Sequence, residues 1–144
     1  MSTRANIKIM DHSPIIYKHS DGYPDWILPI LTPYIEVFIK KRGPDAYYCI
    51  AGILREFHRQ DLIQFRKIED YLKMDMLDPK GLHDSFFLSY GIYTELDSGI
   101  EYLYLIDLNK KKIYIYHNLE DDMVMTDDKT LLREYLPDQT LEIE

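Results

Sequence analysis

The chain is poor in the residues that mark many specialised proteins. Among its 144 residues there is a single cysteine, Cys49, and only six glycines. One cysteine excludes an intramolecular disulfide framework and suits a reducing compartment. The sequence also lacks a glycine-rich phosphate loop, a G-x-S-x-G elbow and an H-E-x-x-H zinc motif. We therefore expect no cofactor.

Long apolar runs are missing too. The longest, residues 26–39, is interrupted by two prolines, a threonine and a glutamate, whereas a membrane-spanning helix needs about 20 apolar residues. The N-terminus has no apolar segment of the kind found in signal peptides. We therefore expect a cytoplasmic protein with no membrane partner.

Negative charge is abundant but concentrated at one end. The net charge is −8, and residues 119–144 contain nine acidic and two basic residues. The rest of the chain is nearly neutral, which makes a nucleic-acid partner unlikely. We expect one domain over residues 1–144 with an acidic C-terminal segment over 119–144. Residues 120–128 should be exposed to solvent, and residues 130–136 should form a short helix.

Hydrophobic periodicity predicts an α+β fold. The clearest helix covers residues 45–60 and continues over 61–73. A helix over 25–41 should break near Pro29, because Pro29 and Pro33 each remove a backbone donor. The predicted strands cover residues 5–10, 15–19, 85–94, 100–108 and 112–117. Together these elements predict a mostly antiparallel sheet of about five strands, with two or three helices packed on one face.

Thirteen tyrosines make this residue the compositional outlier. Several lie in the hairpin formed by residues 100–108 and 112–117. A three-residue loop would place its tyrosines on one face, whereas a two- or four-residue loop would split them between both faces. The sequence leaves both registers open. Most of these tyrosines suit core packing, but an exposed tyrosine-rich face or edge would support self-association into a homo-oligomer.

Residues 19–24 (HSDGYP) form the most informative stretch, where a strand gives way to a helix. Along a strand, positions i and i+2 point to the same side, so His19 and Asp21 are expected to converge, and Tyr23 adds a hydrogen-bond donor. In the structural alternative, Asp21 makes a turn or caps the helix, Gly22 takes a positive φ and Pro24 begins the helix. The residue types fit this structural role well.

Two arginines supply the positive charge for a candidate ligand site. Arg55 and Arg59 lie one turn apart on the polar face of the helix over 45–60, where an anion would relieve their mutual repulsion. A solvated face on which Glu56 and Asp61 partner the two arginines is the favoured explanation. Scattered histidines without ligand-pair spacing predict no metal site. Cys49 lies on the apolar helix and is expected to be a buried, inert thiol.

Three segments resemble a group of small proteins from bacteria, phages and other mobile elements. They are the start T-R-x-N-I at residues 3–7, the corner H-x-D-G-Y-P at 19–24, and the strand I-E-Y-x-Y at 100–104. The resemblance brings no established activity with it. It implies a small accessory protein, encoded by a phage or mobile element and acting in the host cytoplasm, rather than a central metabolic enzyme.

The favoured hypothesis is a non-enzymatic accessory protein that acts against a host pathway by binding. Its partner would be a small anionic, nucleotide-like ligand or a host protein, held by His19, Asp21, Tyr23, Arg55 and Arg59. The alternative is a small hydrolase or phosphodiesterase. In that enzyme His19 would be the base and Asp21 its orienter, while the arginines would hold phosphate.

Overall fold

The computed structural model describes residues 3–72, 89–97, 99–124 and 126–144. Within that part the chain forms a six-stranded sheet in the order β3-β2-β1-β4-β5-β6. The strands are β1 (Ala5–Ile9), β2 (Ile15–Lys18), β3 (Tyr90–Tyr93), β4 (Tyr102–Asp107), β5 (Lys112–His117) and β6 (Gln139–Glu142). The predicted α+β class is confirmed, with one strand more than expected.

Four of the five strand pairings are antiparallel, and β1 pairs with β4 in parallel. The strands predicted over residues 5–10 and 15–19 are confirmed as β1 and β2, and they form an antiparallel hairpin with Ile7 opposite Ile16. Strand β3 begins at Tyr90, and residues 85–88 of the strand predicted over 85–94 lie outside the described residues. The parallel pair places two carboxyl strand ends side by side in the middle of the sheet.

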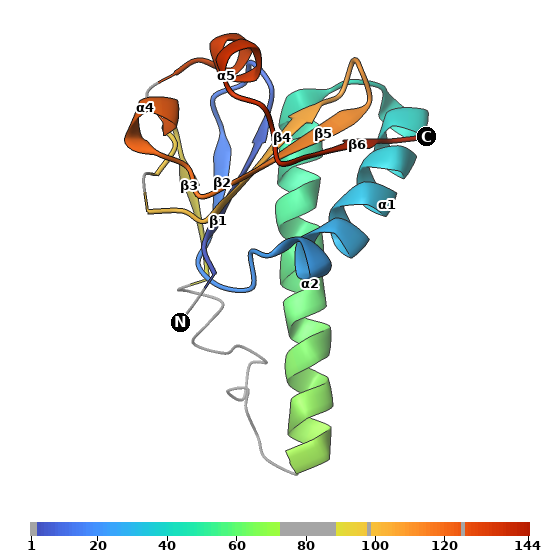
Figure 1. Ribbon diagram of the computed structural model, residues 1–144. Coiled ribbons are helices and arrows are strands. Elements are labelled where there is room, and N and C mark those ends of the chain that lie inside the picture. The colour runs from blue at the N-terminus through green and yellow to red at the C-terminus, as the bar shows by residue number, and fades with distance from the viewer. Residues whose placement is uncertain (1–2, 73–88, 98, 125) are drawn as a thin grey trace.

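The helices cover both faces of the sheet (Figure 1). Helices α1 (Pro24–Arg42) and α2 (Ala46–Leu72) pack on one face over Ile7, Tyr104 and Ile106, while α4 (Asp121–Val124) and α5 (Asp128–Glu134) cover the other. The prediction that the helices share one face is therefore wrong. The alternation of buried residues on β4 explains the difference, because Leu103 and Leu105 on its second face also need cover.

Helix α1 runs without a break through Pro29 and Pro33, contrary to the sequence prediction. Both prolines are exposed, so the carbonyl groups that lose their helical donors face water. The opposite side of the helix carries Ile27, Leu31 and Ile35, which are fully buried. Burial of one such side chain contributes about 1.5–3 kcal/mol, so the three together offset the loss caused by two prolines.

Helix α2 follows after a turn at Gly43, whose φ of 77° suits glycine. The predicted helix over 45–60 and its continuation are confirmed. Ile50, Ile53 and Phe57 on its apolar side are buried, whereas Tyr47 is exposed. Cys49 is buried as expected, and burial raises the pKa of its thiol to about 12. No helix in the described part of the chain is both long and apolar enough to cross a membrane.

The β4–β5 hairpin has a four-residue loop, because Asp107 pairs with Lys112. This register is the one that splits the tyrosines between the two faces. Tyr104 packs beneath α1 and α2, and Tyr116 packs on the opposite side, both fully buried. The hairpin tyrosines are therefore mainly core residues, and the exposed tyrosine-rich sheet face on which self-association was predicted does not form there. The homo-oligomer itself stays a prediction.

The acidic C-terminal segment is part of the fold rather than a tail. It supplies α4, α5 and the edge strand β6, which sequence analysis missed. The short helix predicted over residues 130–136 is present slightly earlier, at Asp128–Glu134. Asp121 and Asp122 are exposed as predicted, but Asp128 is only 4% exposed. Two hydrogen-bond donors reach its carboxylate and compensate the cost of burying this charge.

Candidate functional site

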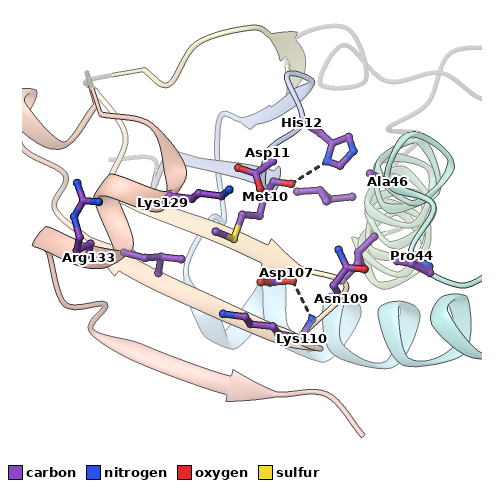
Figure 2. A pocket seen from close by; sticks show the side chains of 13 residues that line it. Met10, Asp11, His12, Pro44, Ala46, Asp107, Asn109, Lys110, Lys129 and Arg133 are labelled. Carbon is purple, nitrogen blue, oxygen red and sulfur yellow. Dashed lines mark hydrogen bonds between the residues drawn. The ribbon is translucent and has the colours of Figure 1, made fainter.

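The parallel pairing of β1 and β4 creates a crevice at one edge of the sheet. After Ile9 the chain turns to β2 on one side, and after Asp107 it turns to β5 on the other side. In open sheets with parallel strands, ligands bind where the connections diverge from neighbouring carboxyl ends in this way. A pocket of about 580 Å³ lies at this point (Figure 2). Small-molecule sites typically measure about 300–1,000 Å³.

Four separate segments line the pocket. The loop after β1 contributes Asp11 and His12, and the loop after β4 contributes Asp107 and Lys110. The other two segments are the start of α2 with the turn before it, and α5. The complete lining is Ile9, Met10, Asp11, His12, Pro44, Ala46, Asp107, Leu108, Asn109, Lys110, Lys129, Leu132 and Arg133. Apolar walls therefore alternate with charged groups, which is the usual composition of a ligand site.

Lys110, Lys129 and Arg133 form the basic cluster of the pocket. Lys129 and Arg133 are one helical turn apart on α5, so they share one face, and Lys110 comes from the loop after β4. In Figure 2 the Lys129 side chain extends across the pocket, while Arg133 lies at its outer rim. The chain as a whole has a net charge of −8, so this cluster stands out against a negative background.

Asp107 and His12 are two polar groups of the pocket that other residues hold in position. Asp107 is 8% exposed, and its Oδ1 accepts a hydrogen bond of 2.9 Å from the backbone N–H of Lys110. His12 Nδ1 lies 2.9 Å from the carbonyl oxygen of Met10. Its ring packs edge-on against Tyr47 at 5.3 Å between centroids. Both side chains are thus held in place before any ligand arrives.

Helix α5 is fixed by hydrogen bonds at its first turn. Asp127 caps it, since its side chain accepts from the backbone N–H of Thr130 at 2.8 Å. That bond and a second from the Thr130 hydroxyl lower the pKa of Asp127. The buried Asp128 accepts from Lys8 Nζ at 2.8 Å and from the backbone N–H of Asp11 at 2.7 Å. These contacts tie the wall that carries two of the basic residues to the end of β1.

The corner over residues 19–24 has a structural role. Asp21, not Gly22, takes the positive φ, at 55°, so the prediction for Gly22 is wrong. Gly22 is needed for space instead, because an added Cβ would lie 2.6 Å from the Cβ of Ala5. Its carbonyl accepts a 2.7 Å hydrogen bond from the hydroxyl of Tyr104. The N-cap of α1 is Tyr23, so Asp21 does not cap the helix.

His19 and Asp21 have different neighbours in the structure. His19 is exposed, and its Nδ1 lies 2.8 Å from the hydroxyl of Tyr17. Burial lowers the pKa of the Lys18 ammonium, and the carboxylates of Asp61 and Asp21 partly offset this effect. Tyr23 is 39% exposed. No contact in the described part of the chain joins the three predicted ligand residues of this corner.

Arg55 and Arg59 lie on α2, away from the pocket lining. Arg59 donates to Glu56 at 2.9 and 3.1 Å, and Arg55 is exposed. Arg59 also lines a shallow hollow between α1 and α2 together with Pro29, Pro33 and Tyr34. Arg59 is thus paired with an acid of its own helix, as the solvated-face alternative predicts.

A second polar cluster, missed by sequence analysis, is buried between β2, β3 and α2. Lys18 is 1% exposed, and its ammonium lies 3.9 Å from the centroid of the Trp26 ring and 3.1 Å from the hydroxyl of Tyr90. That hydroxyl donates to Asp61 at 2.6 Å. Burial lowers the pKa of Lys18 and raises the pKa of Asp61. Period-two alternation could have indicated this cluster, because Lys18 shares a sheet face with Ile16.

The two clusters differ in access. The Lys18 cluster is closed by aromatic rings and holds β2 against α2, whereas the basic cluster opens into a pocket. Among the described residues there is no group of three or more histidine, cysteine, aspartate or glutamate side chains placed to hold a metal ion. The pocket between β1 and β4 is therefore the candidate functional site.

No protein-family model matches the chain, and no significant match was found among curated proteins or solved structures. The resemblance to small phage and bacterial proteins consequently stays a prediction. The function has to be argued from the site itself.

Proposed function

We propose that this protein is an accessory binding protein that holds a small anionic ligand in the pocket between β1 and β4. The observation that supports this most directly is the basic cluster, three cationic side chains placed around a crevice at two carboxyl strand ends. Backbone and side chains around the crevice are held by hydrogen bonds to Asp107 and Asp128. A preformed pocket loses little freedom when it binds, which favours affinity.

The proposal keeps the predicted ligand class and moves the site. The expected ligand residues His19, Asp21, Tyr23, Arg55 and Arg59 belong to the corner and to α2, and none of them lines this pocket. The wider role, action of a phage or mobile-element protein against a host pathway, follows from the motif resemblance alone. Binding of a host protein in place of a small ligand stays a prediction of the same kind.

The hydrolase alternative would use His19 at the exposed corner. The hydroxyl of Tyr17 occupies one ring nitrogen of His19 at 2.8 Å, and Asp21 acts on Lys18 instead. In the described part of the chain, His19 thus has Tyr17 rather than Asp21 as its hydrogen-bonding partner. We favour the binding protein, because the pocket gathers three cations, whereas the base and orienter that the hydrolase would use, His19 and Asp21, do not line it.

The test compares two pairs of basic residues with pyrophosphate as the probe, by isothermal titration calorimetry. The pocket variant combines Lys129→Gln with Arg133→Gln. The matched control combines Arg55→Gln with Arg59→Gln and has the same change in charge. We expect the pocket variant to weaken pyrophosphate binding about tenfold or more, corresponding to about 1.4 kcal/mol. The control should bind like the wild type.

The salt dependence of pyrophosphate affinity provides a second test. Binding that depends on exposed cations weakens as ionic strength rises and the Debye length shortens to about 8–10 Å. The wild type and the arginine control should therefore lose affinity with salt more steeply than the pocket variant. Loss of binding in the Arg55/Arg59 variant alone would place the anion on α2 and refute the pocket. A wild-type protein that binds neither pyrophosphate nor a larger phosphate anion such as ADP would refute the proposal altogether.

A further inference from the structure

The pocket between β1 and β4 has two chemically different ends. Figure 2 shows the basic cluster on the side of α5 and the tip of the β4–β5 loop, and His12, Pro44 and Ala46 on the opposite side. Asp107 lies between the two ends. A ligand that fills the pocket therefore meets positive charge first, then the carboxylates of Asp107 and the exposed Asp11, and a largely apolar wall last.

Asp107 presents an unsatisfied carboxylate oxygen to this pocket. The residue is 8% exposed, and its Oδ1 is bonded to the backbone N–H of Lys110. Its Oδ2 has no hydrogen bond or ion pair with another described residue. Buried carboxylate oxygens normally accept a hydrogen bond. A ligand in the pocket is thus expected to bring a donor to Oδ2.

This requirement separates two kinds of anion. Phosphate and pyrophosphate at neutral pH offer mainly acceptor oxygens, which repel the Asp107 carboxylate. A sugar hydroxyl donates a hydrogen bond to it instead. In a nucleoside phosphate, the sugar lies between the phosphate and the base, in the same order as the basic cluster, Asp107 and the apolar end of the pocket.

We infer that the ligand is a nucleoside phosphate whose ribose hydroxyl donates to Asp107 Oδ2 while its phosphate contacts the basic cluster. The base then lies against Pro44, Ala46 and the His12 ring, which is already held by Tyr47 and the Met10 carbonyl. Flat apolar surface and an aromatic edge favour a planar ring over an extended chain. The inference rests on the proposed function of the pocket and adds the class of its ligand.

The first experiment uses the wild-type protein and three probes in calorimetry: ADP, 2′,3′-dideoxy-ADP and pyrophosphate. A hydrogen bond to a charged group contributes enough to change affinity about 10- to 100-fold. We expect ADP to bind that much more tightly than the dideoxy analogue, which keeps the phosphates and the base but has no hydroxyl for Asp107. Pyrophosphate should be weaker than ADP as well.

The second experiment changes Asp107→Asn. Asparagine keeps an oxygen for the backbone N–H of Lys110 but replaces the Oδ2 acceptor by an N–H donor. We expect ADP affinity to fall about 10- to 100-fold, while pyrophosphate affinity stays the same or rises because a negative charge is removed. Asp25→Asn, at the exposed start of α1, is the matched control for charge.

Each outcome has a distinct meaning. Equal affinities for ADP, dideoxy-ADP and pyrophosphate would overturn the nucleoside phosphate and leave the anion pocket standing. An Asp107→Asn variant that gains affinity equally for ADP and pyrophosphate would also overturn the nucleoside phosphate but not the anion pocket. No binding of any probe would overturn both the ligand class and the proposed function. Should Asp107→Asn unfold, as seen by circular dichroism, the wild-type series still decides.

Discussion

The ion pair between Lys8 and Asp128 allows a quantitative test of how the pocket wall is held. It joins β1 to α5 across 120 positions of sequence, at 2.8 Å between Lys8 Nζ and Asp128 Oδ1. The side chain of Lys8 is 18% exposed and that of Asp128 is 4% exposed. Removal of Lys8 therefore leaves a buried negative charge with one remaining donor, the backbone N–H of Asp11.

The expected magnitudes follow from this burial. Breaking a buried pair costs about 3–5 kcal/mol of unfolding free energy. In Asp128→Asn the ammonium of Lys8 loses its partner but can still reach water, so this change should cost about 2–3 kcal/mol. Lys8→Met leaves the more deeply buried carboxylate of Asp128 without its ion-pair partner and should cost about 3 kcal/mol. At about 2–4 °C per kcal/mol for a chain of this size, either change should lower Tm by about 5–10 °C.

The assay is urea unfolding followed by circular dichroism for the two single variants, the double variant and the wild type. The double-mutant cycle should give a coupling energy of about 1.5–3 kcal/mol. The matched control is the exposed pair of Lys40 and Glu36 on α1, with side chains 67% and 36% exposed. A pair of that kind should couple by less than about 0.5 kcal/mol. Equal coupling in the two cycles would refute the argument from burial.

Two further predictions concern the corner and the buried cluster. Gly22→Ala should cost about 1–3 kcal/mol through overpacking, because its Cβ would lie 2.6 Å from the Cβ of Ala5; Gly99→Ala, with ordinary contacts, should melt like the wild type. Burial lowers the pKa of His58 below its unfolded value of 6.5. As pH falls below 6.5, the His58 imidazole therefore gains its proton in the unfolded chain before it does so in the folded protein, and the free energy of unfolding decreases. In urea unfolding between pH 7 and 5, the free energy of unfolding should depend less on pH for His58→Gln than for the wild type. An equal pH dependence in the two proteins would contradict this reasoning.

Much of the fold could be predicted because its signals are local. The β1–β2 hairpin and the β4–β5 hairpin join neighbouring segments, and α2 carries a long amphipathic pattern. Strand β6 could not be predicted in this way, since three of its four residues are polar and exposed and only Leu141 is apolar. It forms because β5 offers a free row of backbone groups. The continuous α1 depends likewise on tertiary packing, which overrides the cost of two interior prolines.

The candidate site could not be predicted, because its parts are far apart in the sequence. Asp11, Asp107 and Lys129 meet only because β1 pairs with β4 in parallel and α5 folds back over the end of β1. Nothing in the local pattern of either strand indicates that pairing. The corner over residues 19–24 attracted attention for the opposite reason. Its polar residues are adjacent in sequence, yet the structure gives His19 and Asp21 different neighbours.

The acidic C-terminal segment gives the last link between charge and site. Residues 119–144 contain only two basic residues, Lys129 and Arg133, and both line the pocket. The neighbouring acids have separate roles: Asp127 caps α5 and Asp128 anchors it to β1. Other acids of the segment, such as Asp121 and Asp122, are exposed, and their charge repels a long polyanion that extends over them. A small anion can contact the three cations of the pocket without extending over these acids, so we expect this charge distribution to favour a compact phosphate ligand over nucleic acid.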